Sequence, residues 1–263
     1  KQTDALVTKG SLEVHRNVLL LYADDLLLFV SNPITTVPRI IELLDRFGTF
    51  SGYKLNYSKS ECFLISNPAP QIVENDLPFK LSGSSFKYLG VNICKQLSAI
   101  FKTNFLPLTE QIKSDLERWK NLHLSIAGRI NCIEMNVLPR FLYLFQSLPI
   151  YLPKAFFNKI NKLFFSFIWK NGVPGVRRGF LERDRSGGGL ALPNLRSYYW
   201  AANIQKVILW IQQPTLSWCE LEAGSCTSTS LLALITSKLP IPTSQYTDNP
   251  IVITTLKIWS QFR

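Results

Sequence analysis

The chain has 263 residues, 29 Lys and Arg against 18 Asp and Glu, and 46% apolar residues. This composition excludes a disordered tail, a collagen-like repeat and a disulfide-stabilised miniprotein. The five cysteines are scattered and form no CxxC pair, which argues against a zinc site and favours a reducing compartment. No segment has the roughly 20 consecutive apolar residues that a membrane-spanning helix needs.

Positive charge is concentrated in the middle of the chain. Residues 1–94 carry nine basic and nine acidic side chains, residues 95–200 carry sixteen and six, and residues 201–263 carry four and three. The basic third is also rich in aromatic residues. This combination suits a nucleic-acid backbone, because each neutralised phosphate releases a counterion. The other interpretation is a set of amphipathic helices with solvated Lys and Arg.

The first third predicts a mixture of strand and helix. Residues 18–30 are two short apolar runs around Asp24 and Asp25, the pattern of a buried β-hairpin with an acidic turn. A helix is expected from Pro33 to Gly52, which would end it. Short strands are expected at 54–57, 62–66 and 86–93.

After Cys94 the apolar spacing becomes helical, and the fold class predicted for the whole chain is α+β. Pro107 is expected to break or kink the first helix, and the second helix is expected to end before Pro139. A Gly- and Arg-rich loop is expected over 171–189, and the tail from Pro214 gives no clear pattern. The helices are expected at 101–119, 125–138, 153–168 and 194–213.

Two adjacent aspartates at a hairpin turn pose an electrostatic problem. Carboxylates a few ångströms apart repel each other, and the apolar flanks predict partial desolvation. A divalent cation relieves both costs, and Mg²⁺ binds through one or two carboxylates plus substrate phosphates. Asp24 and Asp25 are therefore candidate ligands of Mg²⁺ (or Mn²⁺) in two-metal phosphoryl transfer. The alternative is an exposed turn in which Asp is simply a good turn residue.

A series of short motifs adds to this interpretation. YADD at 22–25 resembles the catalytic box of reverse transcriptases, and the later segments resemble, in order, those of LINE-type (non-LTR) retrotransposon polymerases. The later segments are SGYKLN at 51–56, KS at 59–60, KYLG at 87–90, WKN at 119–121, GRIN at 128–131, LP at 138–139, FIW at 167–169 and GGLALPNL at 188–195.

This resemblance implies an organisation and an activity. Residues 1–95 would be the second part of a polymerase palm, an antiparallel sheet with the catalytic hairpin and the primer grip. Residues 96–182 would be a helical thumb, and 183–263 a helical region beyond it. The activity implied is RNA-directed DNA polymerisation. Its partners would be template RNA, a DNA primer and deoxynucleoside triphosphates, in a ribonucleoprotein of the nucleus and cytoplasm.

The resemblance also implies roles for the residues around the hairpin. Asp24 would be the main metal ligand and Asp25 its neighbour, while Tyr22 and Ala23 would lie against the primer terminus. Lys59 would lie near the incoming triphosphate, where a cation stabilises developing charge or donates a proton to pyrophosphate. Without the resemblance, Lys59 is a solvated loop lysine.

Further residues are implied in binding primer and duplex. Tyr88, Leu89 and Gly90 would hold the primer end; the alternative is a plain strand with a glycine bulge. Gly128 and Arg129 would contact the duplex backbone, although Gly128 equally permits close helix packing.

The loop 171–189 carries another candidate binding site. Arg177, Arg178, Arg183 and Arg185 are candidate ligands of template RNA, or are solvated side chains without a function. The glycine run 187–189 lacks the spacing of nucleotide-binding motifs and is expected to form a tight turn.

The chain departs from a complete enzyme of the family it resembles. The family's third carboxylate lies on a palm strand well before the hairpin, and Asp4 and Glu13 are too close to supply it. We therefore expect a fragment, inactive alone, whose partners include the missing N-terminal palm and fingers. Apolar surface is expected to be exposed in their absence. The alternative function is a non-catalytic remnant that binds RNA–DNA duplex.

Overall fold

The computed structural model describes residues 18–65, 77–237 and 243–262, and over these residues the fold is mixed α and β, as expected. The chain divides into two compact units, Lys1–Gln96 and Leu97–Arg263. The division lies one residue after the boundary expected at 95, and the boundary expected at 182 falls inside the second unit. Asp4 and Glu13 lie outside the described residues.

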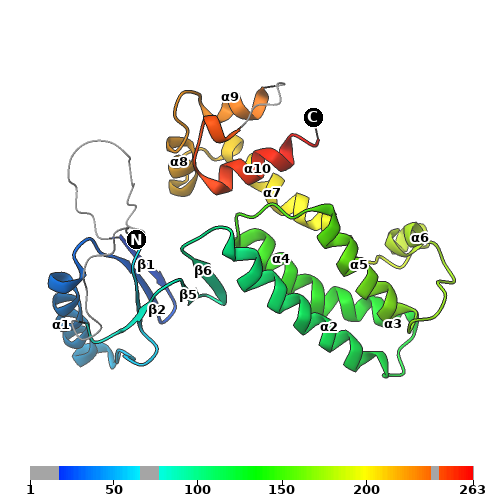
Figure 1. Ribbon diagram of the computed structural model, residues 1–263, viewed down its shortest axis with the longest axis horizontal. Helices are drawn as coiled ribbons and strands as arrows, with labels where there is room; N and C mark the ends of the chain where they lie inside the picture. The colour runs from blue at the N-terminus through cyan, green and yellow to red at the C-terminus, as the bar shows by residue number, and fades with distance from the viewer. Residues whose placement is uncertain (1–17, 66–76, 238–242, 263) are drawn as a thin grey trace. The chain divides into compact units, whose positions relative to one another are not determined.

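The first unit begins with the expected hairpin (Figure 1). Strand β1 (Val18–Tyr22) pairs antiparallel with β2 (Asp25–Phe29). The described side chains of the hairpin are not buried as expected, because Leu21 and Tyr22 are 65% and 62% exposed. A two-stranded sheet cannot cover both of its own faces, so apolar residues suited to a core remain at the surface.

The rest of the first unit contains one long helix and two more strand pairs. Helix α1 (Pro33–Ser51) ends as predicted at Gly52, whose φ of 74° is in the left-handed region that favours glycine. Strands β3 (Glu61–Phe63) and β4 (Lys80–Ser82) are parallel, and β5 (Ser85–Tyr88) and β6 (Val91–Cys94) are antiparallel.

The strands of the first unit differ from the expectation in two ways. The described residues form three separate two-stranded sheets rather than one antiparallel sheet. The strand expected at 54–57 is a loop, and the strand expected at 62–66 is limited to β3, its last residue lying outside the described residues.

The second unit is helical, and its first two helical segments pass through the prolines that were expected to interrupt them. The π-helical turn η2 (Phe101–Phe105) leads into α2 (Leu106–Lys120), and helix α3 (Ile126–Cys132) continues through the π-helical turn η3 (Ile133–Val137) into α4 (Leu138–Ser147).

A π-helical turn precedes each proline by two residues. The backbone N–H of Leu106 donates to the Phe101 carbonyl, and that of Leu138 donates to the Ile133 carbonyl. The wider turn shifts the hydrogen-bond pattern just before a residue that has no N–H to donate. The helix is therefore not broken at Pro107, and the predicted end before Pro139 was wrong.

Aromatic rings fill the core between these helices and α5 (Lys154–Ile168). The rings of Phe105 and Phe156 meet edge to face with centroids 5.8 Å apart, and Phe145 meets Tyr199 in the same way at 5.3 Å. Such pairs add about 0.5–1.5 kcal/mol each to the burial of their apolar area.

The C-terminal part of the second unit is also helical. The segments expected as a loop and an unassigned tail contain short helices. Helix α7 (Leu195–Gln212) matches the helix predicted for 194–213, with the Asn194 side chain accepting the Ser197 N–H. The other helices are α6 (Arg178–Glu182), α8 (Ser217–Gly224), α9 (Leu231–Thr236) and α10 (Pro250–Trp259).

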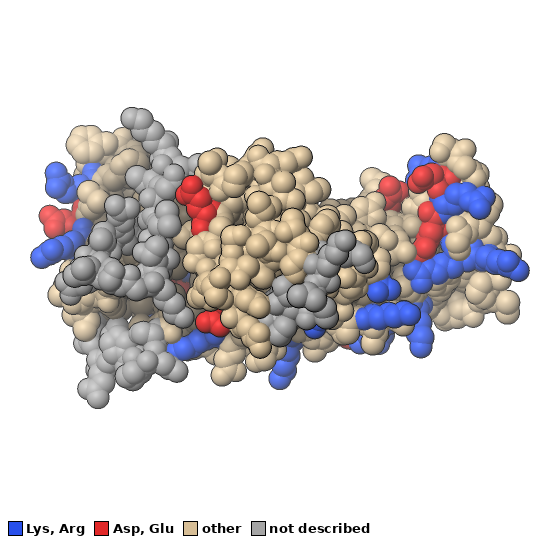
Figure 2. Space-filling view, turned by 90° about the horizontal axis from the view of Figure 1, so that it is seen from above, with Lys and Arg blue, Asp and Glu red and all other residues tan. Residues whose placement is uncertain are grey.

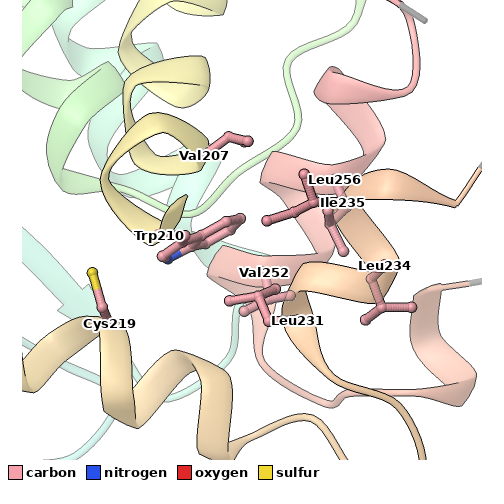
Figure 3. Packing of buried hydrophobic residues seen from close by; sticks show 8 residues of the cluster. All are labelled: Val207, Trp210, Cys219, Leu231, Leu234, Ile235, Val252 and Leu256. Carbon is pink, nitrogen blue, oxygen red and sulfur yellow. The ribbon is translucent and has the colours of Figure 1, made fainter. Parts of the chain in front are cut away.

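Helices α7 to α10 enclose a small core, in which Trp210 lies at the centre (Figure 3). The Trp210 Nε1–H donates to Glu222 Oε2 at 2.5 Å. Burial raises the pKa of Glu222, while the Trp210 hydrogen bond and the charge of Lys206 act in the opposite direction. Among the described helices of both units, none is long and apolar enough to cross a membrane.

Candidate functional site

The acidic hairpin turn has a defined geometry. Tyr22 pairs with Asp25 across the two-residue turn Ala23–Asp24. Ala23 has a φ of 52°, a left-handed conformation that costs a residue with a Cβ about 1–2 kcal/mol. The β1–β2 ladder imposes this strained conformation, and all four residues of the turn are exposed. The hairpin therefore presents two consecutive carboxylates to solvent.

The hairpin carboxylates do not enclose a metal ion by themselves. Within residues 18–65, 77–237 and 243–262, no three His, Cys, Asp or Glu side chains are grouped as a metal site would require. Asp24 and Asp25 can supply two carboxylate ligands, and Mg²⁺ readily takes its remaining ligands from water and phosphate oxygens. The two carboxylates therefore fit a Mg²⁺ or Mn²⁺ ion that substrate phosphates and a further carboxylate complete.

Lys59 lies in a tight loop that Asn56 organises. The Lys59 N–H donates to the Asn56 carbonyl and to Asn56 Oδ1, both at 3.2 Å, and the Ser60 N–H donates to the Asn56 carbonyl at 3.0 Å. These bonds fix the backbone, while the Lys59 side chain is exposed. A long cationic side chain on a fixed backbone can reach a phosphate group without any change in the loop.

Tyr88, Leu89 and Gly90 form a tight turn rather than a continuous strand. Tyr88 pairs with Val91, and Leu89 and Gly90 between them have φ values of 45° and 80°. Positive φ at both central residues is the turn that matches the twist of a two-stranded hairpin. Tyr88 and Leu89 are half-buried and Gly90 is exposed, so backbone at the turn is open to a ligand.

Arg129 does not contact solvent, and its predicted role in duplex binding is corrected. The side chain is 1% exposed, and its guanidinium donates to the carbonyls of Phe167, Lys120 and Leu122 at 3.0 Å and of Leu124 at 3.3 Å. Its Cζ also lies 5.0 Å from the centre of the Phe167 ring. With its donors used in this way, Arg129 joins the C-terminal ends of α2 and α5.

Gly128 has a local role in the same region. Its N–H donates to Ser125 Oγ at 3.1 Å, and Ser125 is the N-cap of α3. A Cβ at Gly128 would lie 3.4 Å from that oxygen, so a small residue suits the cap.

Helix α5 presents a basic face that the sequence interpretation had not singled out. Lys154, Lys159 and Lys162 are exposed on the side opposite the buried residues of the helix. Lys159 approaches Glu110 of α2 at 3.9 Å, an exposed pair that contributes little. Lys154 and Lys162 have no ion-pair partner in the part of the chain that the structure describes.

The distribution of acidic residues along the sequence gives a signal for this basic face. From residue 135 to residue 181 there are seven basic side chains and no acidic one. Helix α2 is different, because Lys113, Arg118 and Lys120 each face an acidic residue of the same helix. In Figure 2 the Lys and Arg side chains gather over the helical unit at the right of the view.

Two of the candidate arginines of the loop, Arg177 and Arg178, have different surroundings. Arg178 Nε donates to Glu182 Oε1 at 2.6 Å, so its charge is largely compensated. Arg177 precedes α6, is exposed, and has no ion-pair partner among the described residues. Of Arg177 and Arg178, it is Arg177 that can bind an anion without breaking an ion pair. The glycine run forms the expected turn, with Gly188 at a φ of 77°.

The structure thus forms two candidate sites, one in each unit. Tyr22, Ala23, Asp24 and Asp25 meet in one turn, and Lys59 and the β5–β6 turn belong to the same unit. The basic face belongs to the other unit and consists of Lys154, Lys159 and Lys162 of α5, and Lys170 and Arg177 are exposed in the loop that follows. A search against models of known protein families finds no match to this sequence.

Proposed function

We propose that this chain is part of an RNA-directed DNA polymerase of the LINE type, and that it contributes the metal-binding hairpin and a helical surface for the RNA–DNA duplex. The observation that carries the proposal is the hairpin turn, where a strained Ala23 and the β1–β2 register hold Asp24 and Asp25 side by side and exposed. Strain of this kind is concentrated at functional sites.

The residues of the hairpin have distinct tasks in this proposal. Asp24 and Asp25 bind the metal, and Tyr22 and Ala23 lie against the primer terminus. A bound Mg²⁺ would lower the pKa of the attacking 3′-hydroxyl and stabilise the charge of the leaving pyrophosphate. Lys59 neutralises charge on the triphosphate or donates a proton to it.

A second candidate function is duplex binding without catalysis. It is favoured by the acid-free stretch 135–181 and the basic face of α5, which need no metal to bind a phosphate backbone. The hairpin would then be an exposed turn whose aspartates bind metal weakly or not at all. The two functions differ in whether metal binding depends on Asp24 and Asp25.

Metal binding can be measured by electron paramagnetic resonance of free Mn²⁺, titrated with the chain in the presence of a primer–template duplex. We expect uptake by the wild-type chain and at least a tenfold weaker uptake by the Asp24→Asn, Asp25→Asn double variant, because amides carry no charge to offset metal desolvation. The Asp45→Asn variant is the matched control, since Asp45 is an exposed carboxylate on α1.

The outcomes separate the two functions. Equal Mn²⁺ uptake by the double variant and the wild type would contradict the catalytic proposal, and duplex binding would remain. Loss of duplex binding in a folded wild-type sample would contradict both. With only two carboxylates at the hairpin, we expect no primer extension by this chain alone.

A further inference from the structure

The loop between α5 and α6 presents an apolar tip to solvent. Val173 is 90% exposed, and the neighbouring Pro174 is also exposed. Because exposing a large apolar side chain is unfavourable, such a tip in a well-defined loop is suited to being covered by a partner.

The conformation of this loop is fixed by hydrogen bonds and by Trp169. The Asn171 N–H donates to the Ser166 carbonyl at 3.0 Å, and the Gly172 N–H donates to the Trp169 carbonyl at 2.7 Å. Gly175 packs over the Trp169 ring, since a Cβ there would lie 3.5 Å from it. These contacts lie on both sides of Val173, which is exposed between them.

The same loop contains strained backbone. Lys170 and Asn171 have φ values of 50° and 63°, a left-handed conformation that is unfavourable for lysine and tolerated by asparagine. The strain at Lys170 is maintained by the surrounding contacts. This strained residue lies at the start of the loop that carries the apolar tip.

Cations flank the tip on both sides. Lys170 precedes it and Arg177 follows it, and both are exposed without an ion-pair partner among the described residues. The lysines of α5 continue this charge along a 15-residue helix about 22 Å long. A line of cations of this length matches a row of phosphates, whereas one small apolar tip gives little insertion into a lipid surface.

We propose that this loop is a wedge that recognises an interruption in base stacking. Val173 and Pro174 lie against the exposed face of a base pair at a strand end or gap, while Lys170 and Arg177 bind the flanking phosphates. The proposal rests on the duplex binding proposed above. Two small side chains bury too little area to offset the unstacking of a continuous duplex, so the wedge acts where stacking is already interrupted.

The experiment measures fluorescence anisotropy of two labelled RNA–DNA duplexes at one salt concentration. Both duplexes are closed by a hairpin loop at each end and have the same number of phosphates. One is continuous, and the other has a two-nucleotide gap. We expect the full chain to bind the gapped duplex about fivefold more tightly, the effect of burying part of one valine side chain. Val173→Ser should remove this preference and leave binding to the continuous duplex unchanged.

The matched control is Lys162→Gln on α5, which should weaken binding to both duplexes by the same factor. Both substitutions are at exposed positions, and circular dichroism would verify that each variant is folded. A wild-type chain that binds both duplexes equally, or a Val173→Ser variant that keeps the preference, would overturn the wedge while duplex binding stands. Failure to bind either duplex would overturn the proposed function itself. Val173-dependent binding to phosphatidylcholine–phosphatidylserine vesicles, without a gap preference, would assign the tip to a membrane.

Discussion

Charged side chains of the same kind have opposite roles at the scale of single residues. Arg129 and Arg177 both belong to the basic part of the chain, yet Arg129 is buried with its donors on backbone carbonyls, and Arg177 is exposed. A buried guanidinium is stable only because those carbonyls replace the water that it loses. Position in the fold, rather than residue type, decides which arginine can bind a phosphate.

Replacing Arg129 tests its structural role. Arg129→Met should lower the free energy of unfolding of the helical unit by about 3 kcal/mol or more, because it leaves several carbonyls at the ends of α2 and α5 without a donor. Urea unfolding followed by circular dichroism measures this. Arg118→Met, at an exposed position, is the control and should change stability by less than about 0.5 kcal/mol. Similar stabilities of the two variants would contradict the assigned role.

Glu222 gives the C-terminal core a pH dependence. Burial raises its pKa above the ordinary glutamate value of 4.5, so the folded state binds a proton more readily than the unfolded state. Its contribution to stability is present below that ordinary value and is lost as the pH rises through the raised pKa. Nearby Lys206 acts against this shift through its positive charge.

The Glu222→Gln variant tests whether ionisation of Glu222 causes this pH dependence of stability. Its amide oxygen can still accept the Trp210 N–H, but it does not ionise. We expect its Tm to match the wild type at pH 4 and to exceed it by about 2 °C or more near pH 8. Thermal scans across this range measure the difference. A constant difference in Tm at every pH would show that ionisation of Glu222 is not the cause.

Helix ends differ in how far residues close by in the chain determine them. The end of α1 and the starts of α3 and α7 lie where the sequence predicted them, at Gly52, Ser125 and Asn194, and each of these residues satisfies a helix end within a few residues of its own position. The helix end predicted before Pro139 was wrong because a π-helical turn shifts the hydrogen-bond pattern just before this residue, which has no N–H to donate. Signals contained in one turn of chain are readable from sequence, and those that depend on packed neighbours are not.

The lysines of helix α5 are expected to bind the phosphates of a duplex. Changing Lys154, Lys159 and Lys162 together to Gln should weaken binding to an RNA–DNA duplex. It should also reduce the slope of log affinity against log salt by up to about 0.9 for each lysine that binds a phosphate. Anisotropy over a salt series measures both quantities.

A matched triple variant in α2 removes the same charge. Lys113, Arg118 and Lys120 each approach an acidic side chain, at 4.0, 2.9 and 3.1 Å, whereas in the α5 set only Lys159 does, at 3.9 Å. Substitution of the α2 set by Gln should therefore change the slope less. Equal effects of the two triple variants would mean that net charge alone, rather than the α5 face, controls binding.

For the whole molecule, the chain combines two units with different chemistry. The unit Lys1–Gln96 is nearly balanced, with ten basic and nine acidic side chains, and displays the acidic turn, while Leu97–Arg263 carries nearly all of the excess positive charge. A polymerase needs both, a metal-binding turn for the reaction and a cationic surface for the polyanion.

The sequence by itself determined the mixed fold class, the acidic hairpin and its turn, the capped helices and the basic middle third. Each of these depends on neighbours in the chain or on a sum over residues. Only the tertiary structure decided that Arg129 is buried, that the hairpin side chains are exposed, and that α5 and the loop after it present lysines and Val173 outward. These depend on which surfaces meet in space, because burial and hydrogen bonding are set by residues far apart in sequence, such as the Phe167 carbonyl that receives Arg129.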